Sequence, residues 1–155
     1  MAIDKVREYL SKFGMEDRVR EFEVSSATVE LAAQALGCEC ERIAKTLSFY
    51  MNESAILIVA AGDAKIDNKK FKEKFQTKAK MVAFEEVEPL IGHSVGGVCP
   101  FGINEGIIVY LDESLKRFET VFPACGSSNS AIELTIDELE KVSGYTEWVD
   151  VCKFA

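Results

Sequence analysis

Two apolar segments separated by a short polar turn constrain the fold of this chain more than any other feature. Residues 45–51 and 55–61 have the composition of β-strands, and residues 52–54, Asn-Glu-Ser, lie between them. Apolar segments that flank a short polar turn are typical of a β-hairpin. We therefore expect an antiparallel pair of strands here. The segment 55–61, the longest strongly apolar run, is much too short to cross a bilayer.

Helical periodicity and capping signals surround this hairpin. Apolar residues that recur at intervals of three and four positions predict amphipathic helices, and a glycine after the last of them predicts the helix end. These signals predict helices at 2–13, from the caps Ser25 or Ser26 to Gly37, from Asp67 or Asn68 through Phe75, at 85–91, and from the capping box Thr135–Glu138 to Ser143. Further strands are expected at 20–24, 107–111, 117–122 and 131–134.

The order of these elements favours an α+β fold. Strands and helices alternate irregularly, and several strands adjoin through short turns, which favours a mixed, largely antiparallel sheet over a doubly wound parallel one. The chain has 155 residues, of which 48% are hydrophobic, and it contains no repeat or linker. We therefore expect residues 1–155 to form a single compact domain.

Charge and cysteine content limit the possible partners. The net charge of −8 disfavours non-specific binding to DNA or other nucleic acid. The five cysteines are scattered, so we expect a reducing compartment and no disulfide framework. Cys38 and Cys40 lack a second pair, and His93 is the single histidine, so neither a metal site nor a cofactor is expected. The first residues lack a signal-peptide pattern, and we expect a cytoplasmic protein with no membrane partner.

A run of lysines is the exception to the acidic balance. Residues 65–80 contain seven lysines against two acidic residues. Such a run forms either a solvated helix face or a local surface for phosphates. The sequence leaves both interpretations open.

The glycine-rich loop 92–102, Gly-His-Ser-Val-Gly-Gly-Val-Cys-Pro-Phe-Gly, is the strongest functional signal. Adjacent glycines allow close approach of the backbone to a bound group, and the proline stiffens the loop. Such a loop is either a plain turn or a cluster of amide groups that suits an oxyanion or a phosphate. Cys99, with His93 as the one possible partner, is a less favoured candidate nucleophile.

Lys45 is the second functional signal. If the strand starts at Lys45, this side chain shares a face with Leu47, whereas Thr46 and Ser48 point to the other face. A lysine in register with apolar residues either reaches solvent from the strand end or lines a cavity and meets an anion there. Two polar turns follow later, one at Asp112 and one at 126–129, each a plain turn or a wall of a site.

Taken together, these segments resemble the YbaK/prolyl-tRNA-synthetase-associated domain family of aminoacyl-tRNA deacylases. The resemblance covers about residues 20–145. The matching stretches stand in the family's order: Thr28–Ala33 with Leu36-Gly37, Ile43–Leu47, Val59–Asp67, Gly96–Phe101, Asp112 after a strand, and Gly126-Ser127 with Asn129 before Ile132–Leu134. The resemblance implies a compact, partly barrel-like mixed sheet flanked by helices.

The resemblance also implies roles for individual residues. It makes Lys45 the contact to the terminal adenosine and the aminoacyl group, and it makes Gly96 and Gly97 the backbone walls around the ester carbonyl. The remaining expected substrate-binding residues are Lys65, which helps to hold tRNA phosphates, and His93, Val98, Pro100, Phe101, Asp112, Gly126 and Ser127.

The function implied is hydrolysis, in trans, of the ester that joins a wrong amino acid to tRNA. The expected partner is the acceptor end of aminoacyl-tRNA, with an aminoacyl-tRNA synthetase as a further candidate. Two alternatives stay open: a non-catalytic module of the same fold that binds tRNA, a nucleotide or a synthetase, and a hydrolase of small esters or thioesters. With one histidine and no nucleophile-elbow motif, a serine hydrolase is not expected.

Overall fold

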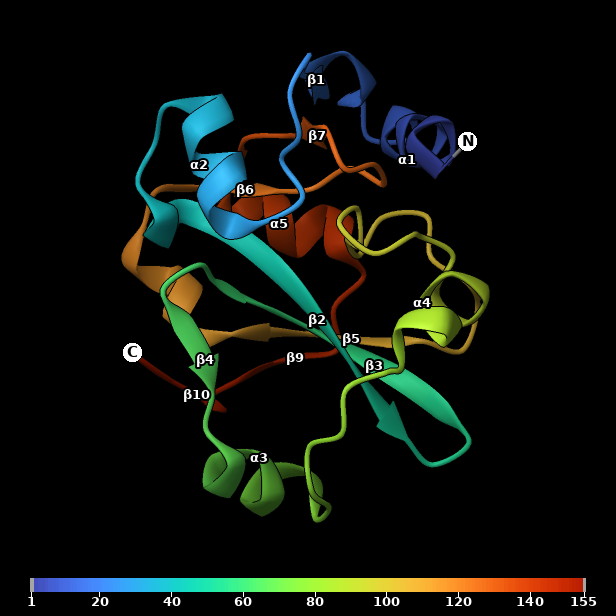
Figure 1. Ribbon diagram of the computed structural model, residues 1–155, viewed down its shortest axis with the longest axis vertical. Coiled ribbons are helices and arrows are strands. Elements are labelled where there is room, and N and C mark those ends of the chain that lie inside the picture. The colour runs from blue at the N-terminus through green and yellow to red at the C-terminus, as the bar shows by residue number, and fades with distance from the viewer. Residues whose placement is uncertain (1, 155) are drawn as a thin grey trace.

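The hairpin predicted at 45–61 forms the centre of the structure, a computed structural model that describes residues 2–154. Strands β2 (Ile43–Met51) and β3 (Ser54–Ala61) pair antiparallel over eight residue pairs. They are the middle of a six-stranded sheet with the order β8-β6-β2-β3-β5-β9. The side chains from Ala55 to Ala61 are at most 2% exposed, because the sheet is covered on both faces at β3. Figure 1 shows this hairpin crossing the middle of the molecule.

The other strands are shorter and pair across long sequence separations. They are β1 (Arg20–Glu21), β4 (Ala64–Ile66), β5 (Ile108–Asp112), β6 (Thr120–Pro123), β7 (Ser130–Ala131), β8 (Leu134–Thr135), β9 (Glu147–Val149) and β10 (Cys152–Phe154). Strand β1 pairs with β7, and β4 pairs with β10, in two separate two-stranded sheets. Of the seven pairings between these strands, four are antiparallel and three are parallel. The mixed sheet and the α+β class are therefore confirmed.

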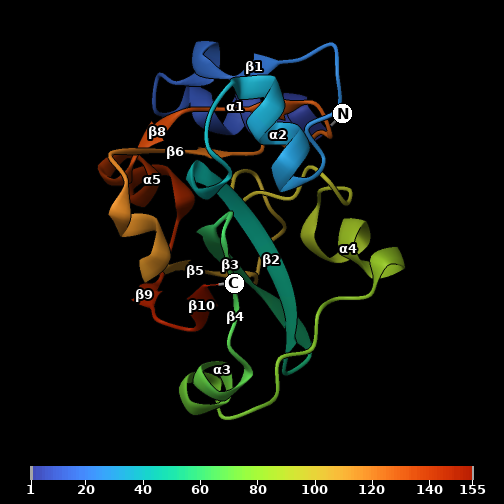
Figure 2. The same ribbon diagram turned by 60° about the vertical axis from the view of Figure 1, so that its left-hand side comes forward.

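Five α-helices surround the strands, and three short 3-10 helices connect them. The α-helices are α1 (Ala2–Ser11), α2 (Val29–Leu36), α3 (Asn68–Phe75), α4 (Phe84–Ile91) and α5 (Ile136–Ser143); the 3-10 helices are Glu16–Arg18, Cys40–Arg42 and Glu113–Arg117. Helices α1 and α2 lie at one end of the molecule and α3 at the other, in both Figure 1 and Figure 2. No helix in the described part of the chain has the length and apolar character needed to span a membrane.

Local signals located most helix ends correctly. The capping box of α5 forms, with Thr135 Oγ1 accepting from the Glu138 amide and the Glu138 carboxylate accepting from the Thr135 amide. Asp67 caps α3, and Gly37, Gly92 and Gly144 end α2, α4 and α5 in left-handed conformations.

Several boundaries were wrong. Helix α2 begins later than expected, because its N-cap is Thr28, whose Oγ1 accepts from the Leu31 amide at 3.1 Å. Helix α1 ends at Ser11 rather than Phe13. The strand expected at 117–122 begins only at Thr120, because the 3-10 helix that Asp112 caps extends to Arg117. The strand expected at 20–24 is confined to two residues, and the one expected at 131–134 is divided between β7 and β8.

Candidate active site

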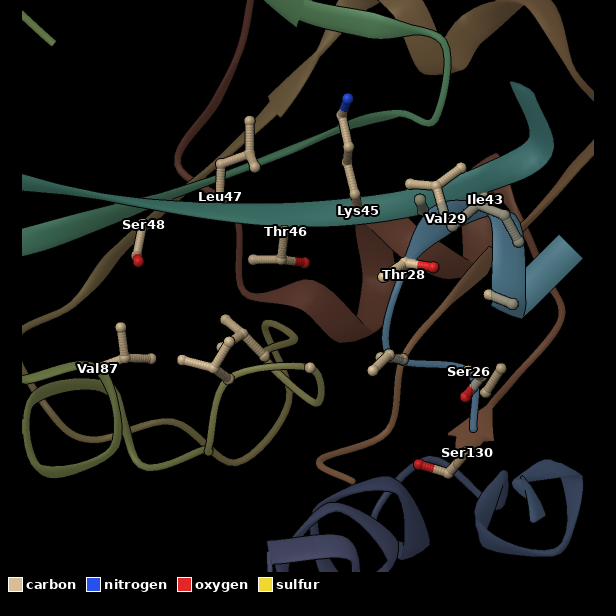
Figure 3. A pocket seen from close by; sticks show the side chains of 18 of the residues that line it. Ser26, Thr28, Val29, Ile43, Lys45, Thr46, Leu47, Ser48, Val87 and Ser130 are labelled. Atoms are coloured by element: carbon tan, nitrogen blue, oxygen red, sulfur yellow. The ribbon is translucent and has the colours of Figure 1, made fainter. Parts of the chain in front are cut away.

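A cavity of about 500 Å³ lies against one face of β2 (Figure 3). Its walls come from β2, the segment 26–29 that leads into α2, the start of α4, the glycine-rich loop and the segments around Phe122 and Ser130. Most lining side chains are apolar: they include Ala32, Ile43, Val82, Val87, Val95, Val98, Phe122 and Ala131. A few hydroxyl groups therefore supply much of the polar character of the walls.

Thr46 and Ser48 face this cavity from β2. Both side chains leave the strand toward Thr28 and Val87, as Figure 3 shows. The Thr46 hydroxyl is inaccessible to solvent and forms no hydrogen bond within the described residues. A buried polar group without a partner costs free energy that a bound group can recover. Thr46 is thus a candidate contact for a ligand in the cavity.

No role for Thr46 and Ser48 was predicted from the sequence, although both were placed correctly on the face opposite Lys45. The alternation of side chains along β2 was the available signal, since two hydroxyl residues share one face. Ser26, Thr28 and Ser130 also line the cavity. The sequence pattern could not predict that these three residues lie near β2, because only the tertiary fold brings them together.

Lys45 lines the cavity at its edge, but its amino group points away from Thr46 and Ser48 (Figure 3). The Lys45 ammonium donates to the backbone carbonyls of Gly62, at 3.4 Å, and Ala64. Half-burial lowers the pKa of Lys45, while the nearby carboxylate of Asp63 acts in the opposite direction. Because Asp63 forms its ion pair with Arg117, the hydrogen-bond acceptors of Lys45 are neutral carbonyls.

The glycine-rich loop forms the opposite wall of the cavity. Gly96 has a φ of +96°, which favours glycine, and it lines the cavity together with Val98. The amide groups of Gly96 and Val98 donate no hydrogen bond to another backbone group within residues 2–154, and both residues line the cavity. The Gly97 amide, in contrast, donates to the Ser94 carbonyl at 3.0 Å. Of the two glycines predicted to bind the ester carbonyl, Gly96 is therefore the one whose amide is free.

Gly97 instead joins the glycine-rich loop to the loop that contains Gly126 and Ser127. A Cβ atom added to Gly97 would lie 2.5 Å from the Gly126 carbonyl carbon and 2.5 Å from the Ser127 nitrogen. Ser127 Oγ lies 2.9 Å from Asn129 Oδ1 and 2.7 Å from Ser130 Oγ. Gly126 and Ser127 thus support the cavity wall through Gly97 and Ser130 and do not line the cavity themselves.

Three residues of the glycine-rich loop, His93, Cys99 and Phe101, turn their side chains into the core. All three side chains are fully buried, and His93 Nε2 donates to the Phe101 carbonyl at 2.7 Å. Burial lowers the pKa of His93, so the ring is neutral, and its Nδ1 has no partner among the described residues. Burial raises the pKa of Cys99 to about 12, which disfavours a nucleophilic thiolate. Pro100 is also buried and does not line the cavity.

Asp112 and Lys65 lie apart from the cavity. The buried Asp112 carboxylate accepts from the amides of Ser114, at 2.9 Å, and Val151, at 3.0 Å, which links β5 to the segment before β10. Lys65 is exposed on β4, where it pairs in register with Lys153 of β10. Of the predicted site residues, the fold therefore brings Lys45, Gly96 and Val98 to the cavity; the substrate-binding roles of the others stay predictions.

The described residues offer no metal site. No group of three or more histidine, cysteine, aspartate or glutamate side chains among residues 2–154 is arranged to hold a metal ion. The chemistry available at the cavity is consequently that of hydroxyl groups, free amides and the nearby ammonium of Lys45.

Comparison with known proteins shows the family to which the chain belongs. Residues 23–142 match the family described as aminoacyl-tRNA editing domain. The match covers all the elements that line the cavity, and the chain belongs to this family. The resemblance noted from the sequence motifs is confirmed.

Particular relatives cover the chain almost completely. The Bacillus subtilis (strain 168) protein named "Uncharacterized protein YwhH" is 56% identical over 99% of this chain and 98% of its own length. A crystal structure titled "putative trans-editing enzyme for prolyl tRNA synthetase" is 30% identical, with a TM-score of 0.87 over 98% of this chain and 97% of that one. The proline–tRNA ligase of Bacillus cereus (strain AH820) is 23% identical over 77% of this chain, which spans 21% of the ligase.

Proposed function

We propose that this protein is an aminoacyl-tRNA deacylase that acts in trans on a mischarged tRNA. The observation that carries the proposal is the largely apolar cavity beside β2, whose lining includes Thr46, with a partnerless hydroxyl, and Gly96 and Val98, whose amides donate to no backbone carbonyl among the described residues. Membership of the editing-domain family supports an aminoacyl ester as the bound group. A cytoplasmic location and an acceptor end of tRNA as the partner belong to the same proposal.

In this proposal the aminoacyl group enters the apolar part of the cavity, and its ester carbonyl meets the Gly96 and Val98 amides. Water adds to the carbonyl carbon, and the negative oxygen that forms is stabilised by these amides. The ester C–O bond then breaks, the ribose oxygen leaves and takes up the proton that the attacking water has lost, and free amino acid and tRNA are released. Thr46 Oγ1 supplies a further hydrogen bond to the bound group once the side chains that cover it move aside. An aminoacyl ester is reactive enough that no nucleophilic side chain is required.

Lys45 has the charge-stabilising role in the proposal. Its ammonium is held by two neutral carbonyls, those of Gly62 and Ala64, on the side of β2 away from Thr46 and Ser48, so it has to turn toward the cavity to meet an anionic group of the substrate. The candidate anions are the phosphate beside the terminal adenosine and the oxyanion of the reaction. A flexible four-carbon side chain allows the ammonium to exchange one partner for another.

A panel of tRNAs charged with wrong amino acids tests the proposal. Purified protein should release the amino acid from at least one of them, and tRNA for proline is the first choice because of the relatives' printed names. Lys45→Ala should lose at least about 100-fold in rate, the usual effect of removing a preorganised charge-stabilising donor. Lys141→Ala, which removes an exposed lysine from α5, serves as the matched control. Full activity of a folded Lys45→Ala variant would contradict the assigned role.

A non-catalytic module that binds tRNA or a synthetase is the second candidate. The observation that favours it is the direction of the Lys45 amino group, which points away from the cavity face of Thr46 and Ser48. In that case the panel gives salt-sensitive binding without release of any amino acid. Generic small esters included in the same panel distinguish a small-molecule hydrolase, which would cleave them faster than aminoacyl-tRNA.

A further inference from the structure

Exposed apolar side chains gather at the mouth of the cavity. Phe84, the first residue of α4, is 72% exposed and lines the cavity. Met81 and Val95, which are 58% and 46% exposed, line it as well. Large apolar side chains that cluster around a cavity and remain in water are typical of a binding surface. The mouth therefore has a recognition role that the hydroxyls and amides inside do not account for.

The segment that carries Phe84 is fixed to the cavity wall. The Val82 amide donates to the Ser48 carbonyl at 3.1 Å, and the Tyr50 amide donates to the Lys80 carbonyl at 2.9 Å. The Ala83 amide donates to the Tyr50 hydroxyl at 3.0 Å. These bonds hold residues 80–83 against the same strand that presents Thr46, so the backbone that leads into Phe84 has a fixed position relative to the cavity. A side chain carried on a fixed backbone loses less freedom on binding a ligand than one on a mobile segment.

The charges around Phe84 indicate which part of a ligand contacts it. Glu85 and Glu86 follow directly and are exposed, so a phosphate group is repelled from the start of α4. Lys78 and Lys80 precede it on the exposed segment before the helix. A ligand that suits both charged neighbours of Phe84 places a neutral, flat group on the ring and directs an anionic backbone toward Lys78 and Lys80. A nucleobase attached to a phosphodiester chain has this chemistry.

We propose that Phe84 is a stacking platform for an unpaired base at the 3′ end of the tRNA acceptor strand. The inference rests on the proposed function, because it takes the acceptor end as the ligand of the adjacent cavity. Met81 and Val95, which are exposed and line the same cavity, extend the apolar surface offered to the ligand. In this arrangement the aminoacyl group lies inside the cavity while the neighbouring base is held at its mouth. Phe84 is thereby a residue that positions the substrate and takes no part in the chemistry.

Equilibrium binding of uncharged tRNA tests the inference without any need for turnover. Removing a stacking aromatic ring weakens binding by about 5- to 150-fold, so Phe84→Ala should lose affinity in this range. Phe84→Tyr should retain it, because the phenol ring also stacks. Ile108→Ala, which truncates an exposed apolar residue on β5 outside the cavity walls, is the matched control and should bind as the wild type does. Since Phe84 is mostly exposed, thermal unfolding should be unchanged in both Phe84 variants.

A second ligand identifies the base. The wild type should bind tRNA that lacks its terminal adenosine more weakly than it binds intact tRNA. The Phe84→Ala variant should bind the two tRNAs with equal affinity. Unchanged affinity of Phe84→Ala, or an equal loss from truncation in both proteins, would overturn the inference. Loss of self-association or of binding to another protein in place of RNA binding would also overturn it, since the surface would then be a protein contact.

The same measurements separate this inference from the proposed function. If tRNA binds through Phe84 but no charged tRNA is hydrolysed, the stacking platform stands and the deacylase proposal fails. If hydrolysis occurs and Phe84→Ala leaves both KM and affinity unchanged, the deacylase proposal stands and the platform is rejected. When both are correct, Phe84→Ala raises KM by about the loss in affinity and leaves kcat nearly unchanged.

Discussion

The Gly97 carbonyl accepts a hydrogen bond from the Gly126 amide at 3.0 Å, and this contact joins the two loops that close one side of the cavity. No side chain fits between them, because a Cβ on Gly97 would meet the backbone of Gly126 and Ser127 at 2.5 Å. The position of the free Gly96 amide thus depends on the absence of a side chain at the next residue.

Gly97→Ala should therefore separate the two loops and reduce both stability and activity. Overpacking of this kind costs about 1–3 kcal/mol of unfolding free energy, which urea unfolding measures. Gly106→Ala is the control, since its Cβ meets nothing within 4 Å and only the positive φ of +86° is strained. We expect Gly106→Ala to keep its deacylation rate. Equal deacylation rates for the two variants would mean that the contact between the loops does not determine the geometry of the site.

Thr46→Val separates a binding role of Thr46 from a structural one. The Thr46 hydroxyl has no partner within the described residues, so its removal should leave the unfolding free energy unchanged or slightly higher. If the hydroxyl binds the substrate, the deacylation rate constant kcat/KM should fall by about 2- to 12-fold, the value of one neutral hydrogen bond. A variant as active as the wild type would exclude Thr46 from the site.

Thr28→Val provides the contrast, because Thr28 lines the same cavity but its hydroxyl caps α2. Loss of this cap should lower the unfolding free energy by about 1 kcal/mol. The two threonines should thus respond in different ways to the same substitution: Thr46 in activity and Thr28 in stability.

Local signals explain which parts of the fold the sequence could predict. The β2–β3 hairpin and the capping box at Thr135 and Glu138 depend on neighbours a few residues apart, and both were predicted at the correct place. Strands β4, β9 and β10 were missed, because each has three residues and its partner lies far away in the sequence: β4 and β10 pair with each other, and β9 pairs with β5. Short pairings of this kind are determined by the tertiary fold, and their periodicity is too brief to detect.

The site was predicted in part for a related reason. Alternation along β2 separated Lys45 from Thr46, but it could not show which face borders the cavity. Both faces of the strand are covered, so the apolar face carries Phe49 in the core while the hydroxyl face meets the loops. The glycine-rich loop was identified correctly as a wall of the cavity. That the Gly97 amide is hydrogen-bonded and the Gly96 amide is not depends on backbone geometry that residue types do not encode.

His93 should make the stability of the protein sensitive to pH. Burial lowers the pKa of His93 below 6.5, so the unfolded chain binds a proton that the folded chain does not. Stability is therefore lost as the pH falls below about 6.5, with a slope of up to about 1.4 kcal/mol per pH unit for this one group. Urea unfolding at pH 7.5 and pH 5.5 should show a smaller difference for His93→Gln than for the wild type.

The same variant tests the predicted substrate contact of His93. Because the ring bonds the Phe101 carbonyl in the core, we expect His93→Gln to lower the unfolding free energy at neutral pH with little change in KM. A large increase in KM without loss of stability would instead support the substrate-binding role.

Lys65 and Lys153 lie opposite each other on β4 and β10, and both are exposed. Like charges in register on neighbouring strands repel, so the pair lowers stability unless an anion lies between them. A tRNA phosphate is such an anion, as the sequence analysis proposed for Lys65. Lys153 extends that proposal to the C-terminal strand, beyond the residues 23–142 that match the editing domain.

Lys153→Glu should consequently act in opposite directions on folding and binding. It creates an opposite-charge pair with Lys65, which should raise the unfolding free energy by about 0.2–1 kcal/mol. It should also weaken tRNA binding, and Lys65→Gln should reduce the slope of log affinity against log salt concentration by about 1, the effect of one lost phosphate contact. Lys141→Gln on α5 provides the control for net charge. If all three variants show the same salt dependence as the wild type, the lysine pair is not a phosphate contact.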